Sequence, residues 1–408
     1  MSPIRVMIAF CFLIPVMHAP ALAAESPDPM AMMERMEPGD RWMTMLHGYA
    51  FLSFNRQGGP SGGRAFESEN HLMLVSMRRW AGGRLSLLGT FTAEPATIPA
   101  EGAPLLFQRG EAYNDVLLVD RQHPHDLFVE LAARWDRPVS DRGAFHLYLS
   151  PWGEPAVGPT AYPHRLSASE NPSAPLAHHN QDSTHISANV ITAGCTLGRW
   201  TLEGSGFHGR EPDERRWNID GGPIDSYSGR LSFRPVEGLS IQISGARRQD
   251  PEELEEGNQT RQTASAEYQR GTSGGFIAAT LILGRNLVRG GAEWGETLEA
   301  TWKLREVHYL YARTESVDRD LFELVNKTQR PESVPAEKVR IHAATLGYVR
   351  DLPLLKRGEA GLGAGLTFYS FRHDLEETYG DFPVSGQLFI RLRGSSHVGG
   401  GAHEHGGP

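Results

Sequence analysis

The sequence predicts an all-β fold, a transmembrane antiparallel up-and-down β-barrel of about 16 strands. Many short stretches alternate apolar and polar residues, which is typical of β-strands. After residue 24 no apolar run approaches the roughly 18 residues that a membrane-spanning helix needs. Long and short connections also alternate along the chain, as in a barrel with loops at one end and tight turns at the other.

The N-terminal residues resemble a cleaved export signal. Arg5 precedes the apolar run 6–16, and Ala21-Leu22-Ala23 matches a small-x-small cleavage site. An uncleaved membrane anchor is the alternative, but the run is too short to cross a bilayer. We therefore expect residues 1–23 to be a signal peptide. Its removal takes away Cys11, so the remaining Cys195 has no partner for an internal disulfide.

Alternating stretches place the barrel at residues 43–393. A soluble β-sandwich pair or a propeller would share the alternation, but a propeller needs a repeat of about 40–50 residues, and none is present. An even strand number puts both ends of the barrel on the short-turn, periplasmic side. We expect strands at 43–54, 67–79, 84–93, 126–135, 144–150, 184–194, 199–208, 226–234, 238–247, 260–270, 274–284, 292–302, 306–314, 338–350, 358–372 and 384–393.

Two segments that flank the barrel carry metal-binding side chains. Residues 24–42 are rich in methionine, whose soft thioether favours Cu(I), and Met43 and Met45 follow directly. The tail 394–408 is rich in glycine and histidine. Each segment is a candidate metal-capturing element. For the tail, the alternative is a disordered end.

Composition excludes several classes of function. Lys+Arg number 40 against 49 Asp+Glu, and no basic patch could follow a nucleic acid backbone. The chain has no glycine-rich phosphate loop before a helix, no Gly-x-Ser-x-Gly elbow between a strand and a helix, and no Cys-x-x-Cys. We therefore expect outer-membrane lipid as its environment and small solutes or metal ions as its ligands.

Three motifs in the middle of the chain concentrate imidazole and carboxylate groups, at residues 120–126, 178–185 and 206–214. Neutral imidazole suits copper and zinc, so one hypothesis is that these motifs bind a transition-metal ion, copper or zinc. The alternative is a hydrogen-bonded network that holds a loop inside the barrel. The candidate metal ligands are His123, His125, Asp126, His178, His179, Asp182, His185 and His208.

The three motifs are expected to converge. The connection 151–183 carries six prolines and is too long for a bare surface turn, so we expect it to fold into the barrel. There His125, His179 and His208 would share one site. The partners expected for the buried imidazoles are Asp126, Asp182, Arg210 and Glu211.

Through these motifs, the chain resembles porin-like outer-membrane β-barrels of Gram-negative bacteria. More narrowly, residues 120–215 resemble poorly characterised exported proteins associated with heavy-metal resistance systems. The resemblance implies an outer-membrane pore or binding protein for small polar solutes, specialised for handling a copper-like transition metal. It supplies no catalytic residues. The alternative function is a barrel-embedded enzyme with a His/Asp site at the loop mouth.

Overall fold

The barrel of the computed structural model is closed. The structure describes residues 38–254, 257–289, 291–355 and 358–398. The signal peptide, most of the methionine-rich segment and residues 399–408 of the C-terminal tail lie outside these residues. β1 (Met43–Arg56) pairs with β19 (Val384–Val398) along 13 residue pairs from Thr44 to Arg56, which joins the two ends of the sheet. Closure leaves no free sheet edge.

Sixteen strands make up the barrel wall. The sheet has 17 strands, but the short β2 (Arg64–Glu67) and β3 (Asn70–Trp80) both pair with β1 and occupy one place in the wall. The predicted all-β barrel is confirmed, and each predicted stretch overlaps one wall strand. The other wall strands are β4 (Gly83–Phe91), β7 (Phe128–Ser140), β8 (Gly143–Gly153), β9 (Ser187–Leu197), β10 (Trp200–Phe207), β11 (Ser226–Val236), β12 (Leu239–Arg248), β13 (Gln259–Thr272), β14 (Gly275–Val288), β15 (Gly291–Leu304), β16 (His308–Asp320), β17 (Lys338–Leu352) and β18 (Glu359–Ser370).

The strands turn apolar side chains outward and polar side chains inward. Along β15, Leu298 is exposed on the outer face while Thr297 and Glu299 are buried in the lumen. The same alternation is the pattern that transmembrane barrels present to lipid. No helix among the described residues is long and apolar enough to cross a membrane. Outward-facing leucines of neighbouring strands include Leu281, Leu298, Leu310, Leu346, Leu366 and Leu388.

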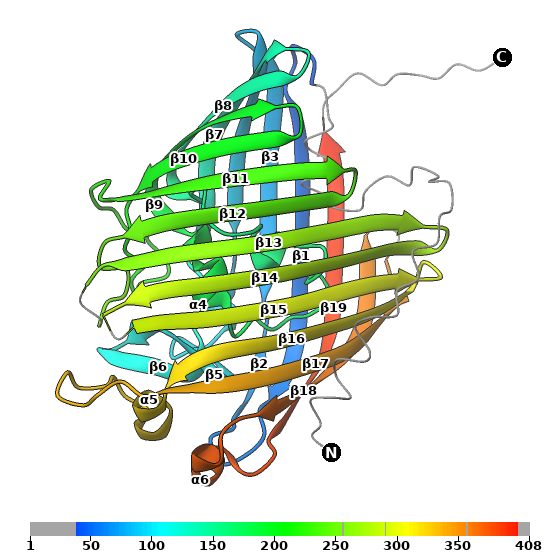
Figure 1. Cartoon of the computed structure of the whole chain (residues 1–408). Coiled ribbons are helices and arrows are strands. Elements are labelled where there is room, and N and C mark those ends of the chain that lie inside the picture. The colour runs from blue at the N-terminus through cyan, green and yellow to red at the C-terminus, as the bar shows by residue number, and fades with distance from the viewer. Residues whose placement is uncertain (1–37, 255–256, 290, 356–357, 399–408) are drawn as a thin grey trace.

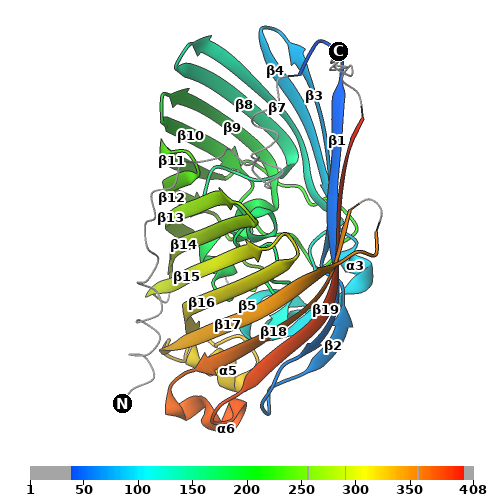
Figure 2. The ribbon, with the colours of Figure 1, turned by 90° about the vertical axis from the view of Figure 1, so that its right-hand side faces the viewer.

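Short turns and long connections lie at opposite ends of the barrel. The turns at 81–82, 141–142, 198–199 and 237–238 each have two residues, whereas the long connections carry small helices. Figure 2 shows α5 (Leu321–Asn326) and α6 (Glu376–Tyr379) at the same end of the barrel. This is the predicted alternation, with one exception: β14 ends at Val288 and β15 begins at Gly291, so the predicted connection 285–291 is short.

Two long connections fold into the lumen. Residues 92–127 form α3 (Glu94–Thr97) and the hairpin of β5 (Ala103–Tyr113) and β6 (Val116–Gln122), which pairs apart from the wall. Residues 154–186 form η1 (Tyr162–His164), α4 (His178–Gln181) and η2 (Ser183–His185). Figures 1 and 2 show the segment with α4 inside the barrel. The β5–β6 hairpin was not predicted, because its residues are buried on both faces and show no alternation.

Charged residues of the wall hold the 154–186 connection in place. Arg391 of β19 pairs with the fully buried Glu170, and Arg165 of the connection donates to Glu299 of β15 at 2.7 Å. Arg313 and Arg319 of β16 donate to backbone carbonyls of the connection at 2.7 and 2.6 Å. These contacts span the lumen, so the connection is part of the barrel's packing.

A glycine that lies opposite a tyrosine tests the packing of the lumen wall. Gly347 of β17 lies opposite Tyr311 of β16, and a Cβ on Gly347 would overlap the Tyr311 ring. We expect Gly347→Ala to destabilise the barrel by about 1–3 kcal/mol, because the ring has to move. Urea unfolding in detergent measures this change.

Gly229 of β11 is the matched control. The nearest atom to a Cβ at Gly229 is the Glu203 carbonyl oxygen at 3.7 Å, an ordinary contact. Gly229→Ala should therefore leave the free energy of unfolding unchanged or slightly raise it. Equal destabilisation by both substitutions would contradict the steric explanation.

Candidate functional site

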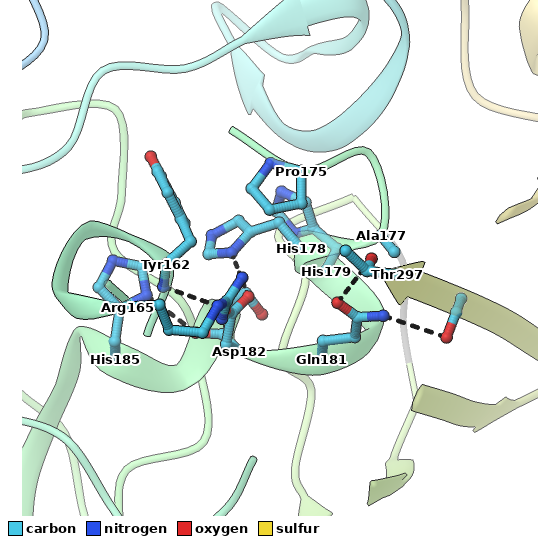
Figure 3. Close-up of polar contacts among 12 residues, drawn as sticks. Tyr162, Arg165, Pro175, Ala177, His178, His179, Gln181, Asp182, His185 and Thr297 are labelled. Atoms are coloured by element: carbon cyan, nitrogen blue, oxygen red, sulfur yellow. Dashed lines mark hydrogen bonds and ion pairs between the residues drawn. The ribbon is translucent and has the colours of Figure 1, made fainter. Parts of the chain in front are cut away.

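Seven of the eight predicted metal ligands meet inside the barrel, and all seven are buried. His123, His125 and Asp126 lie in the segment after β6. The other four lie in α4, in η2 or, for Asp182, between them. The His123 ring lies 5.8 Å from that of His125 and 5.7 Å from that of His179. The His178 ring lies 5.3 Å from His179 and 5.2 Å from His185. Figure 3 shows the imidazoles of α4 and η2 grouped above Asp182.

His125, His178 and His185 form the tightest group, called here the histidine triad. Each offers one ring nitrogen, and these atoms lie within 4.8 Å of one another. The Nε2 atoms of His125 and His185 are buried, and no hydrogen bond from the described residues reaches them. The triad lies beside a small cavity of about 10 Å³, roughly the space of one water-sized sphere.

Each imidazole of the triad is anchored through its Nδ1 atom. His125 Nδ1 lies 2.8 Å from the Glu94 carboxylate, and His178 Nδ1 lies 2.7 Å from the Asp182 carboxylate. His185 Nδ1 lies 2.9 Å from the Asp182 backbone oxygen. An acceptor at Nδ1 fixes the proton there and leaves Nε2 as the donor of a lone pair. Histidine ligands of metal sites are held in this way.

Arg165 fixes Asp182, the central anchor of the triad. The guanidinium is fully buried and pairs with both Asp182 and Glu299, which joins the anchor to the wall strand β15. The backbone N–H of Tyr162 donates to the same carboxylate at 3.0 Å. Burial alone would raise the pKa of Asp182, but Arg165 and His178 outweigh it and hold that pKa well below its usual range. Asp182 is therefore a carboxylate at neutral pH.

Two imidazoles of the triad, those of His185 and His125, differ in how readily they take up a proton. Burial, assisted by His125 and His178, lowers the pKa of His185 well below its usual range. Burial also opposes protonation of His125, but the Glu94 carboxylate outweighs it and the pKa of His125 is raised. A proton would therefore compete with a metal ion at His125, so metal affinity should fall with falling pH.

A second group lies beside the triad and is richer in carboxylates. His179 faces Glu211, with Nδ1 at 3.6 Å from the carboxylate, and Glu252 lies within reach of both. Burial lowers the pKa of His179 to about 3, so this imidazole stays neutral. Arg248 already pairs with Glu211 at 3.0 Å, so the second group has its own cation. The triad offers three imidazole nitrogens within 4.8 Å of one another, a ligand set that suits zinc and copper, which makes it the stronger candidate.

His123 and Asp126 belong to an ion-pair network next to these groups. Arg216 pairs with Glu111 of β5 and, at 3.2 Å, with Asp126. His123 Nε2 lies 3.2 Å from Glu111. Burial, followed by the Arg216 charge, lowers the pKa of His123 well below its usual range. This network joins the 92–127 connection to the connection between β10 and β11.

His208 lies apart from the other seven residues. Its Nδ1 contacts the Asp225 carboxylate at 2.9 Å and the Pro223 carbonyl at 3.0 Å, within the connection between β10 and β11. Among the described residues, no hydrogen bond, ion pair or ring contact joins His208 to the triad. The third motif reaches the cluster instead through Glu211, which accepts a hydrogen bond from Ser183 at 2.9 Å. Arg210, an expected partner, is exposed, and Arg165 and Arg216 take that role.

The sequence did not mark two of the residues that anchor the site, Glu94 and Arg165. Glu94 begins a four-residue helix about 30 residues before His125, and no motif marks it. Arg165 lies among the prolines of the 154–186 connection and has no charged neighbour in sequence. Only the fold brings their charges to the histidines.

Two cavities lead towards the triad. The larger one, the main cavity, has a volume of about 920 Å³ and extends from the short turn at Glu237 and Gly238 to Arg165 and His185. The side cavity, of about 90 Å³, is lined by His71, His125 and His185 among others. Both cavities border Met73 and His164. The triad is therefore reached from the short-turn end.

Comparisons with known proteins identify the fold. No protein-family model matches the chain, and no curated protein matches it in sequence. Among solved structures, the anion-selective porin from Comamonas acidovorans aligns with a TM-score of 0.50 and 12% identity, over 86% of this chain and 99% of that porin. OprB of Pseudomonas putida aligns with a TM-score of 0.48 and 9% identity, over 87% of this chain and 94% of OprB. Outer-membrane expressed OmpT of Vibrio cholerae aligns with a TM-score of 0.46 and 10% identity, over 86% of this chain and 98% of OmpT.

The alignment with the Comamonas porin shows that the chain has a porin-type barrel fold. At this identity the likeness concerns the fold alone. The narrower resemblance to exported proteins of heavy-metal resistance systems stays a prediction.

The buried ion pairs of Arg165 provide a test of the site's framework. We expect Arg165→Met to destabilise the barrel by about 3–5 kcal/mol, because it leaves Asp182 and Glu299 buried without their cation. Arg289→Met is the control, since the side chains of Arg289 and its partner Glu332 are 76% and 79% exposed. The control should cost at most about 1 kcal/mol. Equal values in urea unfolding would mean that the Arg165 pairs add nothing.

Proposed function

We propose that this chain is an outer-membrane channel for small polar solutes in a Gram-negative bacterium, and that its lumen carries a transition-metal site. The histidine triad is the observation that carries the metal assignment. The porin-type fold and the charged lumen support the channel.

The lumen has the character of a passage for polar solutes. The main cavity is lined by cations such as Arg134 and Arg230 and by anions such as Glu130 and Glu203. Charged side chains around a pore select among solutes by their charge. The 154–186 connection crosses this lumen and narrows it, so the passage is restricted to small solutes.

The triad has the chemistry of a metal site. Three imidazoles each place one ring nitrogen within 4.8 Å of the others. The Nε2 atoms of His125 and His185 are buried without a hydrogen-bond partner among the described residues, which costs about 1–3 kcal/mol for each atom. A bound ion would satisfy these atoms. Imidazole suits zinc and copper, and three protein ligands leave a fourth position for a water or a solute.

A metal ion at the triad would also stabilise the narrowing of the lumen. His125 belongs to the 92–127 connection, while His178 and His185 belong to the 154–186 connection. One ion would therefore tie both inward connections together. The structural interpretation of the histidines and the metal interpretation thus describe the same arrangement.

Metal binding is tested with zinc on the full-length chain, purified without a histidine tag. We expect His185→Ala to lose one bound Zn²⁺ relative to the unaltered chain. Glu94→Gln should weaken binding by about 10–100-fold, because it loosens the His125 ring without removing a ligand. Isothermal titration and elemental analysis measure both.

His208→Ala is the matched control, since His208 lies on another connection. It should bind as much zinc as the unaltered chain, and histidines outside the described residues contribute equally to all variants. If His185→Ala and His208→Ala retain the same zinc, the triad is not a metal site.

The channel is tested in planar lipid bilayers. We expect stepwise conductance, and Arg230→Glu should shift the reversal potential towards cations because Arg230 faces the main cavity. Leu366→Val on the outer face is the control and should leave selectivity unchanged. Folded protein without conductance steps would contradict the channel function.

A further inference from the structure

All four methionines among the described residues lie on one patch of the lumen wall, called here the methionine face. Met43 and Met45 belong to β1, and Met73 and Met77 belong to β3. Alternate residues of a strand share a face, and the intervening Leu46, Leu72 and Leu74 are exposed on the outer side. The same two strands thus present leucine to the outside and methionine to the lumen.

The strand register brings these side chains together. Met43 pairs directly with Met77, and Met45 pairs with Val75, which separates Met73 from Met77 on β3. Residues directly opposite each other have Cβ atoms about 4.5–5.5 Å apart. Met45, Met73, Met77 and Val75 form one buried cluster, and the half-buried Met43 and Leu88 pack against it. Several flexible thioethers can therefore approach a common point.

The methionine face borders the cavities instead of a sealed core. Met73 and Met77 line the main cavity, whose other walls carry charged residues such as Arg84 and Glu130. Met73 also lines the side cavity together with His47 and His71. An ion in the main cavity can therefore reach the sulfur atoms.

We propose that the methionine face binds a soft monovalent metal ion such as Cu(I). Thioether sulfur is a soft ligand and selects Cu(I) over hard cations. His47 lies directly opposite Met73 and provides an imidazole at the edge of the face. This site differs from the histidine triad in its ligands and in the class of ion that it takes, and it stands independently of the metal assignment at the triad.

The cavities connect the methionine face with the histidine triad. Met73 borders both cavities, and the side cavity continues to His125 and His185 of the triad. The ring of His164 lies 4.7 Å from that of His71 between them. An ion that enters from the short-turn end meets thioethers before it meets the triad.

Binding of Ag(I) to the full-length chain in detergent tests the site, because Ag(I) is a soft monovalent ion that does not change its oxidation state here. Met73→Leu/Met77→Leu should lose one bound Ag(I) per chain. Methionine and leucine have similar volumes, so the barrel should remain folded. Leu88→Ile, beside the cluster, is the matched control and should keep the full Ag(I) content. Methionines outside the described residues contribute equally in every variant.

Two further measurements make the result decisive. Anomalous scattering from a crystal soaked in Ag(I) should place a silver ion between β1 and β3, and its absence there overturns the proposal. His185→Ala should lose Zn²⁺ but keep Ag(I), which separates this site from the triad. If Ag(I) is lost with His185→Ala and retained in the double methionine variant, the ion binds at the triad and the methionine face is packing alone.

Discussion

The buried ion pairs of Arg165 with Asp182 and Glu299 are the contacts on which the interior of this barrel depends. Glu299 belongs to the wall, Arg165 to the inward connection and Asp182 to the anchor of the triad. A charge buried without its partner is costly, so the three groups have to stay together. The connection is thereby fixed across the lumen, and the histidines acquire one defined arrangement.

A porin-type barrel of this size would leave a wide lumen if its long connections stayed outside. Here two connections enter it and bury polar groups that need partners. The wall supplies them through inward-facing arginines, among them Arg313, Arg319 and Arg391, which bind carbonyls and carboxylates of the 154–186 connection. The remaining space is a cavity that opens towards the short turns. The inward folding of these connections therefore both narrows the lumen and forms the histidine site.

The two proposed metal sites use different means of specificity. The triad relies on imidazoles held by carboxylates, an arrangement that fixes geometry before an ion arrives. The methionine face relies on flexible thioethers, which adapt to the ion and select it by softness. Met73 and Met77 line the main cavity, and His185 lines both cavities, so a metal ion in the main cavity can reach each site without crossing the wall.

The sequence by itself determined the barrel, because strand alternation and the alternation of short and long connections are local properties. It also marked His125, His178 and His185 as metal-binding candidates, since their residue types occur in dense motifs. Only the tertiary structure decided which of these residues meet. It placed Glu94 and Arg165 beside them and left His208 apart, because contacts between connections depend on how each one enters the lumen. The β5–β6 hairpin and the methionine face also became visible only in the tertiary structure. The hairpin is buried on both faces, which hides its alternation. The methionine face depends on the pairing of β1 with β3, which brings together methionines far apart in sequence.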